Sequence, residues 1–148
     1  DEITGLKKLT GRVNDLITGE FMKIGLVNED GKIEVGFDTE RNIMVVDVLG
    51  TLDECRFTMD GFPVSKEIAR IYYRNTPWSQ AVEQAKKEDR QQWKEICRLN
   101  PEPLPERLNM LISQVYCACT NAVTQREWFP GVPSVKEVLE EIRQVLPM

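Results

Sequence analysis

The chain has 148 residues and a mass of 17.0 kDa, with 41% hydrophobic and 29% charged residues, which suits a single domain over residues 1–148. This composition excludes collagen-like, low-complexity and wholly disordered chains. The net charge of -5 argues against nucleic acid as a partner, and no apolar run approaches the roughly 20 residues of a membrane helix, so we expect a soluble protein.

The first half of the chain is predicted to contain one helix followed by a β-hairpin. Apolar residues recur every three or four positions over residues 5–24, which is typical of an amphipathic helix. Two runs rich in β-branched residues, 32–37 and 43–49, flank the polar residues 38–42 and predict two antiparallel strands. We expect residues 50–64 to be irregular.

The second half is predicted to be helical, with helices at residues 66–74, 77–99, 106–124 and from 134 onward. Ser65 is the predicted N-cap of the first of these helices, and Ser134 begins a capping box. Three prolines make residues 100–105 a stiff connector. The fold class is therefore α+β, an antiparallel hairpin or small sheet packed against several helices.

The residue types limit the chemistry that this chain can perform. The sequence has no histidine, which excludes imidazole bases and histidine-ligated zinc. The four cysteines, at positions 55, 97, 117 and 119, lack the spacing of a zinc site or a redox pair, and we expect free thiols in a reducing cytoplasm. Carboxylates, lysines, arginines, backbone groups or an oxygen-held metal must then carry any reaction.

The predicted hairpin carries the first candidate site. Alternation places Lys32 and Glu34 on one face of the first strand, and Asp47 interrupts an otherwise apolar second strand. If Gly36 pairs with Ile43, Lys32 faces Asp47, and the two carboxylates suit a magnesium ion with bound phosphate. The alternative is a solvated cross-strand ion pair without function, and a shift of one residue would move Asp47 to the opposite face.

A second group of polar residues follows the hairpin. Arg56 is a candidate for bidentate binding of a carboxylate or phosphate. Ser65 begins a helix whose free amides could bind an anion, and Lys66 and Arg70 share one face of that helix. The pattern alone favours the alternative of an ordinary solvated helix face.

Several of these segments resemble the signatures of one enzyme family. Residues 30–36, DGKIEVG, resemble the D-x-K-hydrophobic-E-F-G signature of phosphoribosylaminoimidazole-succinocarboxamide synthase (SAICAR synthetase), a ligase of purine biosynthesis. Residues 46–47 and 53–57 are similar to the family's second-strand Asp and its D-x-x-R-[FL] motif. Residues 65–70 resemble its [SD]-K-x-x-x-R helix, and residues 116–128 resemble a degraded form of its Y-x-x-x-x-x-x-L-T-G-x-x-W motif.

The resemblance implies a reaction and a setting. ATP activates the carboxylate of carboxyaminoimidazole ribonucleotide, the amine of L-aspartate attacks it, and ADP and phosphate are released. The resemblance also implies an ATP-grasp-related C-terminal part of a cytoplasmic enzyme. The N-terminal nucleotide-loop part has no counterpart in this sequence and would be a partner, so we expect this chain alone to be inactive. Homo-oligomerisation is left open.

The resemblance further implies roles for individual residues. The residues placed at the reacting phosphates are Lys32, Glu34 and Asp47, with Glu34 and Asp47 as ligands of Mg²⁺. The residues placed at the substrates are Asp30, Asp53, Arg56, Ser65, Lys66 and Arg70. Val35 stands where the family usually has Phe, and Val48 where it often has an acidic residue. Two alternatives are a non-catalytic structural or interaction module of this family and an unrelated α+β binding domain.

Overall fold

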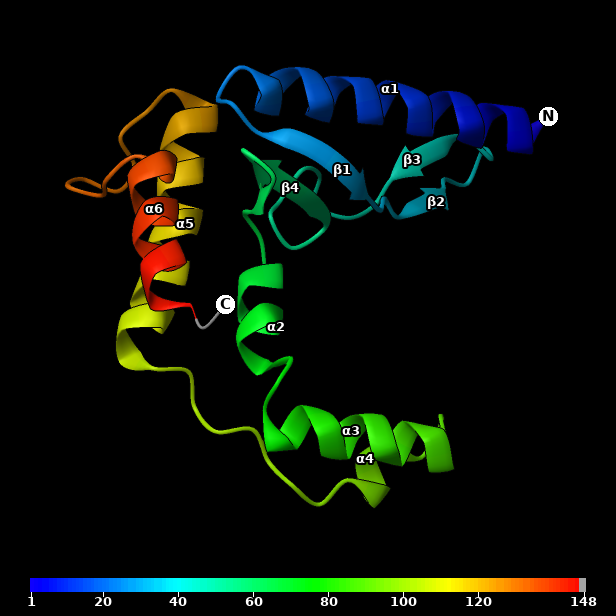
Figure 1. Ribbon diagram of the computed structural model, residues 1–148. Helices are drawn as coiled ribbons and strands as arrows, with labels where there is room; N and C mark the ends of the chain where they lie inside the picture. Colours follow the sequence, from blue (N-terminus) through cyan, green and yellow to red (C-terminus); the bar gives the residue numbers. More distant parts are fainter. Residues whose placement is uncertain (147–148) are drawn as a thin grey trace.

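Six helices and five strands form in residues 1–146, which are the residues that the computed structural model describes (Figure 1). The helices are α1 (Glu2–Met22), α2 (Glu67–Tyr73), α3 (Pro77–Glu88), α4 (Trp93–Ile96), α5 (Glu106–Thr124) and α6 (Val135–Val145). The strands are β1 (Val27–Gly31), β2 (Val35–Phe37), β3 (Ile43–Val45), β4 (Cys55–Met59) and β5 (Phe62–Pro63). The predicted α+β class is confirmed.

Helix α1 lies along the strands and confirms the first predicted helix (Figure 1). The carboxylate of Asp1 accepts a hydrogen bond of 2.9 Å from the Thr4 amide and caps the first turn. The apolar stripe buries Val13, Ile17 and Phe21. The chain leaves the helix through Gly25, whose φ of +80° is in the left-handed region that glycine adopts readily.

The strands β1, β4 and β5 form a three-stranded antiparallel sheet in that order, and β4 and β5 lie where the sequence predicted irregular chain. That prediction for residues 50–64 is wrong. In β4, Cys55 and Phe57 are buried while Arg56 is exposed, which is the alternation of a strand with one solvated face. Asp60 and Gly61, with φ of 51° and 72°, form the two-residue turn into β5.

The strands β2 and β3 confirm the predicted hairpin, but the predicted register is wrong. Gly36 pairs with Met44 and not with Ile43. The reason lies in the turn, where the Asp38 carboxylate accepts hydrogen bonds from the amides of Glu40 and Asn42 at 2.9 and 2.7 Å. The Asp38 amide also donates to the Asn42 carbonyl, at 3.0 Å, and this pairing fixes every later partner in the ladder.

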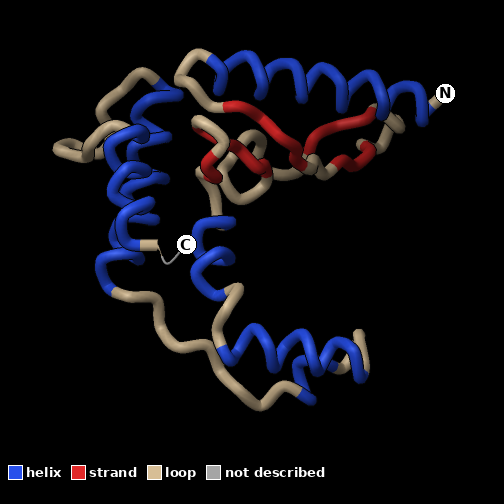
Figure 2. Tube along the Cα trace, in the orientation of Figure 1, coloured by secondary structure: helices blue, strands red, loops and turns tan. Residues whose placement is uncertain are grey.

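Two of the predicted helices differ from the observed ones. Helix α2 is preceded by Lys66 as its N-cap residue and not by Ser65, which is buried one position earlier. The predicted helix over residues 77–99 breaks after α3 because Asp89 is extended and its carboxylate accepts bonds from the amides of Gln91 and Gln92. Only the short helix α4 follows, and α3 and α4 pack on each other apart from α1 (Figure 2).

Helices α5 and α6 form as predicted and lie side by side (Figure 2). The capping box is present, with the Ser134 hydroxyl accepting from the Glu137 amide and the Glu137 carboxylate accepting from the Ser134 amide. Leu111, Val115 and Ile142 are fully buried in the core that joins these helices to the sheet. Within residues 1–146 we find no helix with the length and apolar character needed to span a bilayer.

We expect Phe57→Ala to lower the free energy of unfolding by about 3–5 kcal/mol, because it empties a core position at the centre of β4. Phe57 is 1% exposed and its ring stacks on that of Phe21 with 4.1 Å between centroids. Urea unfolding followed by circular dichroism measures the change. The matched control is Phe129→Ala, at an exposed position, for which we expect a change within about 0.5 kcal/mol. Equal losses in the two variants would contradict this account of the core.

Candidate functional site

Asp30 and Arg56 face each other on neighbouring strands and form a two-point ion pair. They are direct partners in the β1–β4 ladder. Arg56 Nε donates to Asp30 Oδ1 at 2.6 Å, and a second guanidinium N–H donates to Asp30 Oδ2. This hydrogen bonding lowers the pKa of Asp30 below its ordinary value of 3.8. The guanidinium is exposed, so it is accessible to an anion.

The pair lines an open groove of about 450 Å³. Strands β1 and β4 form one side of this groove and the start of α2 forms the other, and its polar lining residues are Glu29, Asp30, Arg56, Thr58, Ser65 and Glu67. The groove thus brings together three residues that the sequence predicted to bind substrate, Asp30, Arg56 and Ser65. We refer to it as the β1–β4 groove.

Asp53 and Lys66, both expected to bind substrate, lie beside each other and are joined through the backbone of Asp53. The Lys66 ammonium donates to the backbone carbonyl of Asp53. The Asp53 carboxylate accepts a hydrogen bond of 2.8 Å from the Tyr116 hydroxyl of α5. Burial, together with this bond, raises the pKa of Tyr116. Asp53 is therefore tied to α5, a contact that sequence reasoning missed because 63 residues separate the two side chains.

Glu67 forms ion pairs with two arginines at the rim of the β1–β4 groove. Its carboxylate accepts from Arg70 at 3.2 Å and from Arg74 at 2.8 Å. Arg70 was a predicted substrate residue, whereas Arg74 was not. The helical spacing of Glu67, Arg70 and Arg74, three and seven residues apart, is the signal that could have found this cluster.

Lys32 bridges two carboxylates, but only one of them is the predicted partner. Its ammonium lies 2.8 Å from Glu34 Oε1 and 3.0 Å from Glu54 Oε2. The two carboxylates raise the pKa of Lys32. Glu54 was missed as a site residue although it lies inside the D-x-x-R motif, because nothing in a single sequence shows that residues 32 and 54 meet.

Glu34 and Asp47, the expected pair of metal ligands, were placed on one face by a register that the structure does not have. The Val46 amide donates to the Glu34 carbonyl at 3.1 Å, so Glu34 lies opposite Val46, and Asp47 follows in a bend beyond the end of β3. Asp47 is exposed, and its carboxylate accepts a bond of 2.8 Å from its neighbour Val48. In the described residues no cluster of three or more acidic or cysteine side chains is close enough to hold a metal.

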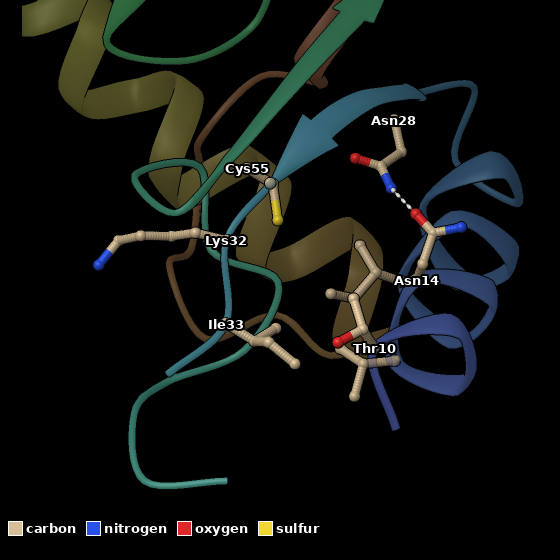
Figure 3. Close-up of a pocket in the computed structure, with 9 residues that line it drawn as sticks. Thr10, Asn14, Asn28, Lys32, Ile33 and Cys55 are labelled. Carbon is tan, nitrogen blue, oxygen red and sulfur yellow. Dashed lines mark hydrogen bonds between the residues drawn. The ribbon is translucent and has the colours of Figure 1, made fainter. Parts of the chain in front are cut away.

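A small cavity of about 80 Å³ lies between α1 and β1 and reaches the segment after β1 that carries Lys32 (Figure 3). Ile33 and Cys55 point into it, whereas the Lys32 ammonium points away (Figure 3). Asn28 closes the top through hydrogen bonds to Thr18, at 3.0 Å, and Asn14, at 3.4 Å. The cavity is mainly apolar. All four cysteines, including Cys55, are free thiols as predicted.

Comparison with known proteins now decides the family. The family model for SAICAR synthetase matches residues 1–91, which is more than half of the chain and includes the whole β1–β4 groove. The chain belongs to the SAICAR synthetase family. It is 49% identical over 146 residues, 99% of the chain, to a protein of Archaeoglobus fulgidus named as a putative phosphoribosylaminoimidazole-succinocarboxamide synthase.

Two further relatives carry the synthase name without qualification. The Thermoplasma acidophilum protein is 30% identical over 86% of the chain, and the Thermoplasma volcanium protein is 30% identical over 79% of it. The chain aligns with 43% of the length of the Archaeoglobus relative and with 44% and 40% of the two Thermoplasma relatives. The family resemblance read from the motifs is therefore confirmed, and the matched region is less than half of each SAICAR synthetase relative.

We expect Arg56→Gln to return the pKa of Asp30 towards 3.8, because the hydrogen bond from Arg56 is the largest cause of its lowering. A carboxyl pKa lowered on folding stabilises the fold above its unfolded value, and this contribution is lost as the pH falls through the folded value. Carboxyl-carbon NMR titration measures the pKa directly. Arg107→Gln, which removes a different exposed ion pair, is the control and leaves Asp30 unchanged. A low pKa that persists in Arg56→Gln would contradict the assignment.

Proposed function

We propose that this chain is the C-terminal, substrate-binding portion of a SAICAR synthetase. The complete enzyme joins L-aspartate to carboxyaminoimidazole ribonucleotide with the hydrolysis of ATP to ADP and phosphate, in the cytoplasm. The main support is membership of the family, together with 49% identity to the Archaeoglobus relative. The remainder of the protein supplies the nucleotide loop, so the isolated chain is inactive.

The observation that carries the proposal is the exposed Asp30–Arg56 pair in the β1–β4 groove. The ribonucleotide presents a phosphate and a carboxylate, and the planar guanidinium of Arg56 matches either group with two parallel hydrogen bonds. Exposed ion pairs contribute only about 0–1 kcal/mol, so a substrate anion can displace Asp30 from Arg56 at little cost. Lys66 and Arg70 provide further positive charge near the same groove.

The phosphates of ATP are proposed to lie near Lys32 and Glu34. Phosphoryl transfer depends mainly on positioning and charge neutralisation, which a lysine supplies without a histidine. Magnesium enters the proposal as the counter-ion of ATP. Because the register that placed Glu34 and Asp47 on one face is not the observed one, we assign no step of the reaction to a metal held by that pair.

The two alternatives receive less support. The degree of identity to the synthase relatives removes the hypothesis of an unrelated binding domain. The hypothesis of a non-catalytic module is not favoured, since the Arg56 fork and Lys32 are accessible at the surface, where a substrate can reach them.

In the full-length source protein, we expect Arg56→Ala to raise the KM for carboxyaminoimidazole ribonucleotide about 10- to 100-fold. This is the size of effect expected when one charged hydrogen-bonding group is lost. The KM for ATP should change by less than about threefold, because Arg56 acts on the other substrate. Steady-state rates at varied concentrations of each substrate measure both constants.

Arg98→Ala is the matched control, since Arg98 is exposed in the segment after α4 and lines no part of the groove. We expect wild-type constants for this variant. A larger effect of Arg56→Ala on the KM for ATP than on that for the ribonucleotide would overturn the proposed role of the groove.

A further inference from the structure

The two-stranded ribbon β2–β3 has one covered face and one open face. Helix α1 covers the face that carries Ile43, and the two lie so close that a Cβ added to Gly5 would be 2.8 Å from Ile43 Cδ1. The opposite face carries Gly36 and Met44, followed by Val46 and the exposed Glu34 at its end. A Cβ added to Gly36 would lie 3.0 Å from Val46 Cγ1, which places these two residues together on that face.

The open face, with Met44, continues into residues 46–49, an exposed and mostly apolar segment in which Asp47 is the one charged residue. Met44 is 48% exposed, Val46 56% and Val48 60%. Scattered exposed apolar residues are ordinary, but several exposed apolar residues close together mark an interaction surface. We refer to the face with Met44 and Val46, together with residues 47–49, as the ribbon face.

Both edges of the ribbon are also open among the described residues, because this sheet contains only β2 and β3. The pairs Val35–Val45 and Phe37–Ile43 alternate with the hydrogen-bonded pairs, so their amides and carbonyls point outward. Natural proteins protect such edges with lysine, proline or bulges, and β3, with the sequence IMV, has none of these. A two-stranded ribbon is marginally stable unless further structure packs on it.

The length of the relatives indicates what covers this surface. The chain aligns with only 40–44% of the three SAICAR synthetase relatives compared above. More than half of each relative therefore lies outside the matched region. A second copy of this chain is a poorer occupant, since a two-fold contact centred on residues 44–49 would bring two Asp47 carboxylates together in a protein of net charge -5.

We propose that the ribbon face and the free edge of β3 form the docking surface for the remainder of the SAICAR synthetase polypeptide. The remainder adds a β-strand to that edge and packs apolar side chains over Met44, Val46 and Val48. Main-chain hydrogen bonds give the contact its strength and the alternate side chains fix its register. This inference rests on the premise of the proposed function that the chain is part of a longer synthetase.

Hydrogen–deuterium exchange on the full-length source protein tests the proposal. The amides of Ile43 and Val45 point outward from the ribbon, so docking should slow their exchange at least 100-fold relative to unstructured peptide. Exchange at the unstructured rate would overturn the proposal, as would an intact mass of 17.0 kDa for the source protein.

A pair of matched variants adds a second readout. Val46→Asp places a charge in the contact, and we expect limited proteolysis of the source protein to accelerate at least tenfold. Met110→Asp changes an apolar residue of α5 that is 43% exposed and lies away from the ribbon, and proteolysis should stay within twofold of wild type. Equal behaviour of the two variants would overturn the proposal, and so would conversion of a dimer to a monomer by Val46→Asp in sedimentation.

The ligase assay, run in parallel, keeps the two proposals separate. Slow exchange and the expected proteolysis difference in a source protein without ligase activity would support docking and contradict the proposed function. Full ligase activity with fast exchange at Ile43 and Val45 would support the proposed function and overturn docking.

Discussion

The burial of Phe57 against α1 is the constraint that positions the candidate site. Its ring stacks on Phe21 and is shielded from solvent, which fixes β4 beneath the helix. Because side chains alternate along a strand, the buried positions of Cys55 and Phe57 require Arg56 to point outward. The antiparallel pairing with β1 then sets Asp30 directly opposite Arg56. The charged pair in the groove is therefore a consequence of core packing on the other side of the same strand.

The charges around the groove share one property, which is that each cation already has a partner. Arg56 is held by Asp30, Arg70 and Arg74 by Glu67, and Lys66 by a backbone carbonyl. These partners orient long side chains before any ligand arrives and so reduce the entropy lost on binding. Exposed ion pairs are also weak enough that an anion such as phosphate can replace the carboxylate that holds the arginine or lysine. The arrangement suits reversible binding of an anionic substrate.

The elements that could be predicted from the sequence are those with long periodic patterns. Helices α1, α5 and α6 each carry an apolar stripe over several turns, and α6 adds a capping box, so local signals agree with the tertiary fold. Strand β1 was missed because its sequence VNEDG is mostly polar and exposed. Strand β4 was missed although its alternation and the Asp60-Gly61 turn were visible, and these signals could have found the β4–β5 hairpin.

The site was predictable in its parts but not in its contacts. The motifs named Asp30 and Arg56 separately but paired Arg56 with Asp53, and the observed contacts of Arg56 with Asp30, of Lys32 with Glu54 and of Asp53 with Tyr116 each join distant parts of the chain. The register of β2–β3 was missed because hydrogen bonds accepted by the Asp38 carboxylate set it, and the observed register differs by one residue from the one that placed Glu34 beside Asp47. Family membership does not depend on that pair, since the sequence comparisons establish it independently.

The central claim is that the β1–β4 groove binds the imidazole ribonucleotide. The most direct measurement is an NMR titration of the isotope-labelled source protein with carboxyaminoimidazole ribonucleotide, following the Nε–H signals of its arginines. The account predicts a saturable shift of the Arg56 signal, with the Arg98 signal unmoved. Saturable binding that leaves Arg56 unmoved would contradict the account and place the ribonucleotide elsewhere on the protein.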